Sequence, residues 1–353
     1  MQSNNISSNN HACCQTTPKK WVWYRDQLII SLVFLAVFLS LGRFVSLLNP
    51  FQLAFWHFVR MIWWAVLAGM ILGGLIDYYI PKIYISKYLA RRRKQTIFYS
   101  VGLGFLMSAC SHGILALAME LHKKGAGGPA VVSFLLASPW ANLPVTFLLV
   151  GFFGIKGVLI IFCALVVAIV TGLIFQKLEA RGLIEKNIHE ISVDEDFSIL
   201  EDVKHRWQAY PFSSKALWKD ALGIVRGMWE LSEMILGWIL IGSILASLVS
   251  AYVPSHFFHH FLGSSFMGLG VTLAFSALLE VCSEGTAPLA FEIYKQTGAL
   301  GNSLVFLMAG VATDYTEIGL IWTNLGKKTA LWMMGISIPQ ILFLGWLLNL
   351  LRV

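Results

Sequence analysis

Charged residues are scarce in this chain. Asp, Glu, Lys and Arg make up 13% of its 353 residues, whereas 57% are hydrophobic. A soluble globular domain carries about 25% charged residues. The composition therefore excludes an ordinary water-soluble fold and indicates an integral membrane protein.

Other features are missing, and each absence removes a class of protein. The short alternating segments of an outer-membrane barrel do not occur; apolar stretches of about 20 residues recur instead, which predicts membrane-spanning α-helices. No Gly-x-x-x-x-Gly-Lys-Ser/Thr string is present, which excludes a nucleotide-binding loop of that type. Five cysteines are too few and too scattered for a disulfide scaffold.

The net charge of +7 does not imply nucleic acid as a partner. Most Lys and Arg residues lie beside apolar spans, where they orient helices and meet anionic lipid headgroups. We therefore expect the lipid bilayer to be the surrounding partner. Residues 1–20 are polar and lack the basic region and apolar core of a secretory signal, so we expect a disordered cytosolic tail.

One short string occurs twice. Cys110-Ser111-His112-Gly113 heads the first copy and Cys282-Ser283-Glu284-Gly285 heads the second. Shifted by 172 positions, residues 110–137 match residues 282–309 without a gap, and ten of these 28 pairs are identical, including Cys, Glu and Lys pairs. Shared hydrophobicity does not explain such matches. The sequence therefore predicts two internal repeats with one thiol in each.

The predicted fold is an all-α integral membrane protein with about eight to nine membrane segments. Two further strings extend the repeat: Val59-Arg60-x-x-Trp63 recurs as Val225-Arg226-x-x-Trp229, and Tyr79-Ile80-Pro81 resembles Tyr252-Val253-Pro254. The expected organisation is a cytosolic tail (1–20), an additional N-terminal membrane helix (21–53), repeat 1 (54–176), a charged cytoplasmic linker (177–220) and repeat 2 (221–353).

The loops after the second span and its counterpart differ in charge. Residues 81–96 hold six Lys and Arg, whereas residues 251–265 hold none. The positive-inside rule places the first loop in the cytoplasm and the second outside, so the repeats would be inverted. Inversion requires that one stretch in each half fails to cross, and Pro139 and Pro144 favour a broken or re-entrant segment at 129–150. Its counterpart lies near Thr313–Glu317; a parallel repeat in which every stretch crosses is the alternative.

Two cysteines are the main candidates for chemistry. A deprotonated thiol is a soft donor, and Cys110 and Cys282 from equivalent segments could hold one thiophilic centre. His112 could add a ligand or accept the thiol proton, and Glu284 holds the matching position. Cys163, on a plain apolar stretch, is expected only to pack.

Further candidates are less specific. Ionisable residues at membrane depth are costly, and Glu280, Asp314 and Glu317 are therefore candidates for proton coupling. Cys13 and Cys14 form a vicinal pair that could hold a soft metal ion; the alternative is a solvated tail with two incidental cysteines.

At these residues the chain resembles the ArsP-type (YraQ-like) membrane permeases, whose characterised members expel trivalent organoarsenicals and whose relatives are linked to other heavy metals. The shared pattern is the Cys-Ser-x-Gly string followed by Phe134–Pro139 and Asn142, and by Phe306–Gly310 in the second half. The resemblance implies a substrate site at Cys110, Ser111, His112, Asn142, Cys282, Ser283 and Glu284, with Cys110, His112 and Cys282 as ligands of the cargo. Many relatives have a second cysteine where His112 stands, so an organomercurial or an inorganic metal ion fits comparably well.

The sequence thus leads to an inner-membrane permease that exports a thiophilic metalloid, metal or organometal by alternating access, without a cofactor. A cytosolic carrier protein is a possible partner. The alternative from another class is a membrane thiol oxidoreductase that uses Cys110 and Cys282 with His112 as base. A structural subunit is a third option.

Overall fold

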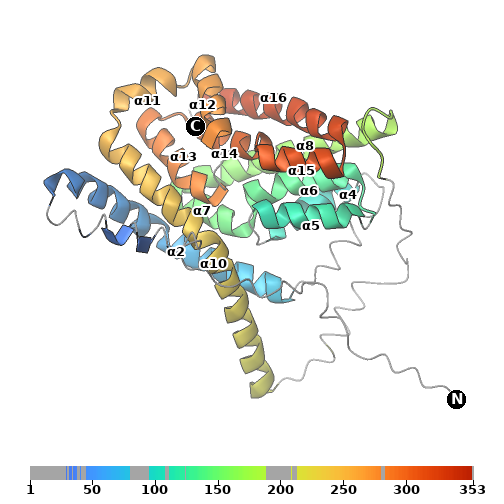
Figure 1. The fold of residues 1–353 in the computed structure, drawn as a ribbon, viewed down its shortest axis with the longest axis horizontal. Helices are drawn as coiled ribbons and strands as arrows, with labels where there is room; N and C mark the ends of the chain where they lie inside the picture. The colour runs from blue at the N-terminus through green and yellow to red at the C-terminus, as the bar shows by residue number, and fades with distance from the viewer. Residues whose placement is uncertain are drawn as a thin grey trace.

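The computed structural model describes residues 45–79, 95–107, 111–123, 125–187, 213–279 and 283–351, with isolated positions between 29 and 40 and position 208. Every element in this part of the chain is a helix, which confirms the all-α fold (Figure 1). In order, the elements are the short turn η2 (Ser46–Leu48), α2 (Asn49–Tyr79), α4 (Gln95–Leu106), α5 (Ser111–Lys123), α6 (Gly128–Ala141), α7 (Leu143–Phe153), α8 (Ile155–Ala180), α10 (Ser214–Tyr252), α11 (Ser255–Phe261), α12 (Phe266–Leu279), α13 (Ser283–Thr297), α14 (Leu300–Ala312), α15 (Tyr315–Asn324) and α16 (Lys327–Leu351).

Four helices are long and apolar enough to cross a membrane. They lie at Ser46–Ile76, Ile155–Ala180, Leu217–Tyr252 and Lys327–Leu351, and three bent helix pairs raise the number to as many as seven. These spans and bent pairs agree with the predicted all-α membrane protein, in which one stretch of each half was expected not to cross. The apolar stretch 97–119 is divided between α4 and α5. Most of the expected first span lies outside the described residues.

The helices repeat with the same offset as the sequence. Helices α5, α6, α7 and α8 begin at residues 111, 128, 143 and 155, and α13, α14, α15 and α16 each begin 172 residues later. The packing repeats as well, because α4 and α5 pack along α6 as α12 and α13 pack along α14. Breaks and turns thus fall at equivalent positions in both halves.

Equivalent helices run antiparallel to each other. The segment after α8 contacts the start of α16 through Glu185 and Lys328, and the middle of α8 contacts the middle of α16 through Thr171 and Gln340. In the same way the start of α2 lies beside the end of α10, where the Tyr252 hydroxyl donates to the Leu47 carbonyl. The two repeats are therefore inverted with respect to one another, as the charge of the loops predicted.

The change of direction within each half lies earlier than predicted. Helices α4 and α6 are parallel, because Ile97 and Ser133 both lie against Gly172 and the Ser138 hydroxyl donates to the Gly104 carbonyl. Helix α5, the next described element, returns along α6. With 12 and 13 residues, α4 and α5 are each about 18–20 Å long, less than the roughly 30 Å of a hydrocarbon core. They form a hairpin that enters and leaves on one side.

The stretch that we expected to be broken or re-entrant is a bent helix pair. Helices α6 and α7 are inclined by 40° at Asn142, and α14 and α15 by 42° at their equivalent break. The second hairpin is α12–α13: α12 runs parallel to α14, since Asn302 donates to Thr272 and Ser276 donates to the Phe306 carbonyl. Each half therefore holds one long helix, one hairpin, one bent pair and a final long helix, which leaves three crossings per half.

Two close contacts show how precisely the halves correspond. In the first half Gly104 on α4 admits the hydroxyl of Ser138 on α6. In the second half the two residue types are exchanged, because Gly310 on α14 admits the hydroxyl of Ser276 on α12. In both cases a glycine lets two parallel helices approach closely while the serine binds a backbone carbonyl.

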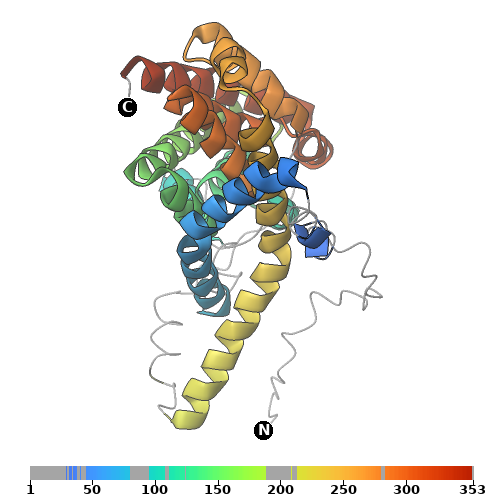
Figure 2. The same ribbon diagram turned by 90° about the vertical axis from the view of Figure 1, so that its left-hand side faces the viewer.

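Helices α2 and α10 correspond at an offset of 173, close to that of the later helices. Residues 56–81 match residues 229–254 without a gap, with ten identical positions of 26, and the helices end at Tyr79 and Tyr252. The Val-Arg-x-x-Trp pairing is therefore displaced by seven residues. The eight additional residues of α10 lie at its start, which projects from the other helices (Figures 1 and 2).

The start of the charged linker is packed rather than fully solvated. Helix α8 continues to Ala180, and Ile184 and Asn187 after it are buried. The Asn187 side chain donates to the carbonyls of His122 and Ala126, which ties this segment to the turn between α5 and α6. Residues 188–207 and 209–212 lie outside the described part of the chain.

Candidate functional site

A helix begins immediately after each of the two repeated cysteines. Ser111 is the first residue of α5 and Ser283 is the first residue of α13, so both cysteines precede a helix at the turn of a hairpin. Cys110, Glu280 and Cys282 lie outside the described residues, as do the side chains of Ser111, His112 and Ser283. Cys13 and Cys14 are outside them too.

The helices that follow the cysteines contact the opposite repeat. Helix α13 of the second half lies against α7 of the first, and α5 of the first half lies against α15 of the second. Helices α7 and α15 are each the second helix of a bent pair, so each contact joins the helix after a repeated cysteine to the helix after a break in the opposite repeat. Backbone irregularities at such an interface line the transport site in inverted-repeat transporters.

Glu284 lies at one of these two places. Its side chain is 1% exposed and lines a cavity of about 10 Å³ together with residues of α2, α7 and α10. The other lining residues are Val66, Met70, Pro144, Leu148, Ile235 and Ile239. All of them are apolar, and the space suffices for about one water molecule. Glu284 is therefore a buried carboxyl residue on the contact between the two repeats, which agrees with the position expected of a site residue.

Asn142 and Asp314 are equivalent residues at the two helix breaks. The Asn142 side chain accepts a hydrogen bond from the Val145 backbone N–H (2.8 Å) at the start of α7. The Asp314 carboxylate accepts from the N–H groups of Thr316 (2.7 Å) and Glu317 (3.1 Å) at the start of α15. Both side chains thus cap helices that begin inside the protein, where free N–H groups would otherwise lack partners.

Glu317 is a second buried carboxylate. It lies in the first turn of α15, next to the cap, and is 4% exposed. The structure therefore places Asp314 and Glu317 together at the second break, and Glu284 at the contact between α13 and α7. Within the described ranges, no three His, Cys, Asp or Glu side chains lie close enough together to hold a metal ion. Glu284, Asp314 and Glu317 are therefore not part of such a cluster.

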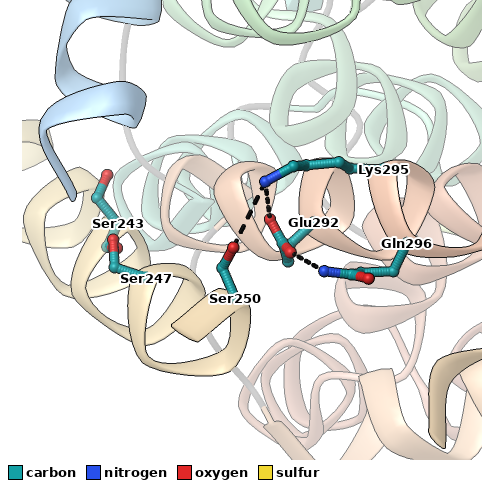
Figure 3. Close-up of polar contacts among 6 residues, drawn as sticks. All are labelled: Ser243, Ser247, Ser250, Glu292, Lys295 and Gln296. Atoms are coloured by element: carbon teal, nitrogen blue, oxygen red, sulfur yellow. Dashed lines mark hydrogen bonds and ion pairs between the residues drawn. The ribbon is translucent and has the colours of Figure 1, made fainter. Parts of the chain in front are cut away.

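Sequence reasoning overlooked Glu292 on α13. Its side chain is fully buried, accepts a hydrogen bond from the Gln296 amide (2.6 Å) and lies 3.6 Å from the Lys295 amine (Figure 3). Lys295 also reaches the hydroxyl of Ser250 on α10 at 3.5 Å. The signal was present in the sequence, since Glu292 and Lys295 are identical to Glu120 and Lys123 in the first repeat.

Cys163 occupies an ordinary packing position. It is 6% exposed on α8, surrounded by the apolar core, and its thiol is free. This agrees with its expected role and makes it a suitable control for the two repeated cysteines.

Residues 47–350 match the ArsP-type family of predicted permeases. The chain belongs to this family. Its ArsP-type relatives include the UPF0718 protein MJ0584 of Methanocaldococcus jannaschii, which is 25% identical over 78% of this chain and 88% of its own length. The UPF0718 protein YcgR of Bacillus subtilis is 24% identical over 80% of this chain and 91% of its own length. No solved structure matches significantly.

Membership in the ArsP-type family establishes the coarse function. The protein is a multi-pass membrane permease, and the family supports a transporter rather than an enzyme. The thiol oxidoreductase considered from the sequence is accordingly not favoured.

Proposed function

We propose that this permease exports a thiophilic metalloid, heavy metal or organometal, such as a trivalent organoarsenical, by alternating access around Cys110 and Cys282. The observation that supports it most is that a helix begins directly after each cysteine, at the turn of one hairpin in each inverted repeat. In this proposal the cysteines, with His112, bind the cargo through soft donor atoms. Ser111, Asn142, Ser283 and Glu284 complete the site.

The proposed location is the inner membrane, with the linker in the cytoplasm. Lys and Arg gather at the end of the bundle where α8 ends and α10 begins; they are Lys123, Lys177, Arg181, Lys186, Lys215, Lys219, Lys327 and Lys328. Towards the opposite end the described residues include Lys156, Lys295 and Arg60, the last within α2. This asymmetry favours the linker end as the cytoplasmic side. A cytosolic carrier could deliver cargo there, with Cys13 and Cys14 as weak acceptors.

Because the chain lacks a nucleotide-binding loop of the common type, we propose that an ion gradient supplies the energy, with a separate ATPase as the alternative. Glu280, Asp314 and Glu317 are the candidates for proton exchange, since a carboxyl group that changes its proton while changing its access couples the two processes.

Uptake into everted membrane vesicles tests the thiol site. Vesicles with the intact protein, Cys110→Ser or Cys282→Ser are given a trivalent methylarsenical, arsenite or phenylmercury, and accumulated metal is measured by mass spectrometry. We expect uptake of at least one probe by the intact protein and loss of that uptake in both variants. Cys163→Ser is the matched control and should transport normally. Equal accumulation in all four proteins would remove both cysteines from the mechanism.

A further inference from the structure

Helices α2 and α10 do not sit symmetrically on the repeated core. They pack along each other, and each is the repeat equivalent of the other. However, α2 packs along α7 whereas α10 packs along α13. Exact symmetry would require α10 to pack along α15 and α2 along α5, and neither of these pairs is in extensive contact among the described elements. The α2–α10 pair is therefore displaced toward the α7 and α13 side of the core.

Equivalent residues consequently have opposite environments. Leu148 on α7 is 1% exposed, whereas its counterpart Leu320 on α15 is 40% exposed. Glu292 on α13 is fully buried beside α10, whereas Glu120 on α5 is exposed. Yet the Glu-x-x-Lys string is identical in both repeats. If α5 and α13 occupy the buried environment in turn, both need the same residues there, which would explain why the string is identical in the two repeats.

Two equivalent glycines mark the contacts between the pair and the core. Gly69 on α2 lies against Pro144, where an added Cβ would be 3.0 Å from the Pro144 Cα. Gly242 on α10 lies against Gly285, where an added Cβ would overlap the Gly285 carbonyl oxygen. Gly69 and Gly242 correspond at the offset of 173. The same position in the two helices is thus kept free of a side chain although its present neighbours differ.

We propose that this structure is one of two states, and that in the other the repeats exchange their roles against the α2–α10 pair. The inference rests on the alternating-access function proposed above and names the contacts that change. In the second state Gly69 leaves Pro144 and lies against Gly113 of α5. Gly242 leaves Gly285 and lies against Thr316 of α15. Glu120 and Lys123 then enter the buried environment, and Glu292 and Lys295 leave it.

The present interface is suited to such a movement. Its centre is an aromatic cluster in which Phe58 of α2 contacts Phe152 of α7 and Phe291 of α13. One polar contact of α13 with α10 is long, with 3.5 Å between the Lys295 amine and the Ser250 hydroxyl (Figure 3). Apart from Glu284 and Glu292, the surfaces described at this interface are apolar, and rigid-body movement of one bundle against another is a common route to alternating access.

Two engineered cysteine pairs distinguish the states. Gly69→Cys with Pro144→Cys tests the present state, because the added Cβ at Gly69 lies 3.6 Å from the Pro144 Cβ, within disulfide range. Gly242→Cys with Thr316→Cys is the exchanged pair and can close only in the second state. Membranes that contain each variant are treated with an oxidant. Peptide mapping then identifies which two cysteines each disulfide joins, so a bond to a native cysteine is recognised as such. The four single variants are the controls.

We expect both pairs to form disulfides, and each bond to stop transport until it is reduced. Because Gly242→Cys disturbs the contact with Gly285, Trp238→Cys with Thr323→Cys provides a second exchanged pair, derived from the present contact of Gly151 with Ala65. Closure of the first pair without closure of either exchanged pair, in membranes and in detergent, overturns the two-state inference. The disulfide readout requires no cargo. Closure of an exchanged pair together with normal transport by Cys110→Ser would therefore refute the thiol site and leave the inference intact.

Discussion

Glu185 shows how one side chain can stabilise a helix far away in the sequence. Its carboxylate accepts hydrogen bonds from the N–H groups of Lys328 and Thr329 (both 3.0 Å) and from the Thr329 hydroxyl, at the start of α16. Partial burial acts to raise the pKa of Glu185, but these hydrogen bonds outweigh it and hold the pKa below its ordinary value of 4.5. At neutral pH the Glu185 carboxylate is therefore ionised, and in this form it connects the linker to the start of α16 in the second repeat.

We expect Glu185→Ala to lower the melting temperature in detergent by about 2 °C at pH 7, corresponding to roughly 1 kcal/mol for a lost cap. Since the folded-state pKa is depressed, the stabilisation is present above pH 4.5 and is lost as pH falls through the folded-state value. The difference between variant and parent should therefore shrink below about pH 4. Lys186→Ala, next in the chain and exposed, is the control. A pH-independent difference would contradict this account.

Glu292 and Glu120 offer a matched comparison of one residue in two environments. Glu292→Ala removes a buried carboxylate from Lys295 and Gln296. We expect a loss of about 1–2 kcal/mol, because Lys295 remains partly exposed and water can solvate its amine. Glu120→Ala should stay within about 0.5 kcal/mol, as for most exposed positions. Thermal unfolding of both variants in one detergent gives the comparison, and equal losses would mean that burial does not separate the two sites.

At the scale of elements, the sequence located the helix breaks but not the turns of the hairpins. Pro144 and Asn142 indicate the interruption, because proline is favoured in the first turn of a helix and asparagine caps its start, whereas Pro139 lies within α6. Residues 107–110, between α4 and α5, include neither proline nor glycine, so the sequence of the stretch 97–119 is that of one span. Its reversal depends on packing against both sides of α6, which hydropathy does not report.

The two caps at the breaks lead to a further prediction. Asn142→Ala and Asp314→Ala should each lower stability by about 1 kcal/mol, because N–H groups at an internal helix start lose their partner. Asp314→Asn retains an acceptor oxygen and should unfold within about 0.5 kcal/mol of the parent. Its transport activity then separates two roles. Normal transport would assign Asp314 to capping alone, whereas loss of transport with unchanged stability would support proton exchange.

At the scale of the molecule, duplication and inversion were both predictable. The offset of 172 was visible in residues 110–137, and the contrast between the loops at 81–96 and 251–265 gave the orientation. The displacement of α2 and α10 was not predictable. The repeated sequence is equally compatible with packing of the pair against α7 and α13 and against the equivalent helices α15 and α5. The correct alignment of α2 with α10 was missed because the Val-Arg-x-x-Trp strings match at an offset that differs from the correct one by seven residues, or about two helical turns.

The equivalence of Gly69 and Gly242 gives the last prediction. In the present state an added methyl at Gly242 overlaps the Gly285 carbonyl, whereas one at Gly69 meets the Pro144 Cα at 3.0 Å. In the second state the closer contact would be at Gly69, against Gly113, and the looser one at Gly242, against Thr316. Gly242→Ala should therefore favour the second state and Gly69→Ala the present one, while both slow transport.

Carbodiimide labelling of carboxyl groups, followed by mass spectrometry, measures this shift. Gly242→Ala should show more modification of Glu292 and less of Glu120, and Gly69→Ala the opposite. Gly270→Ala, where an added methyl meets no neighbour, is the control. Shifts in the same direction for both variants would mean that the two glycines serve packing alone.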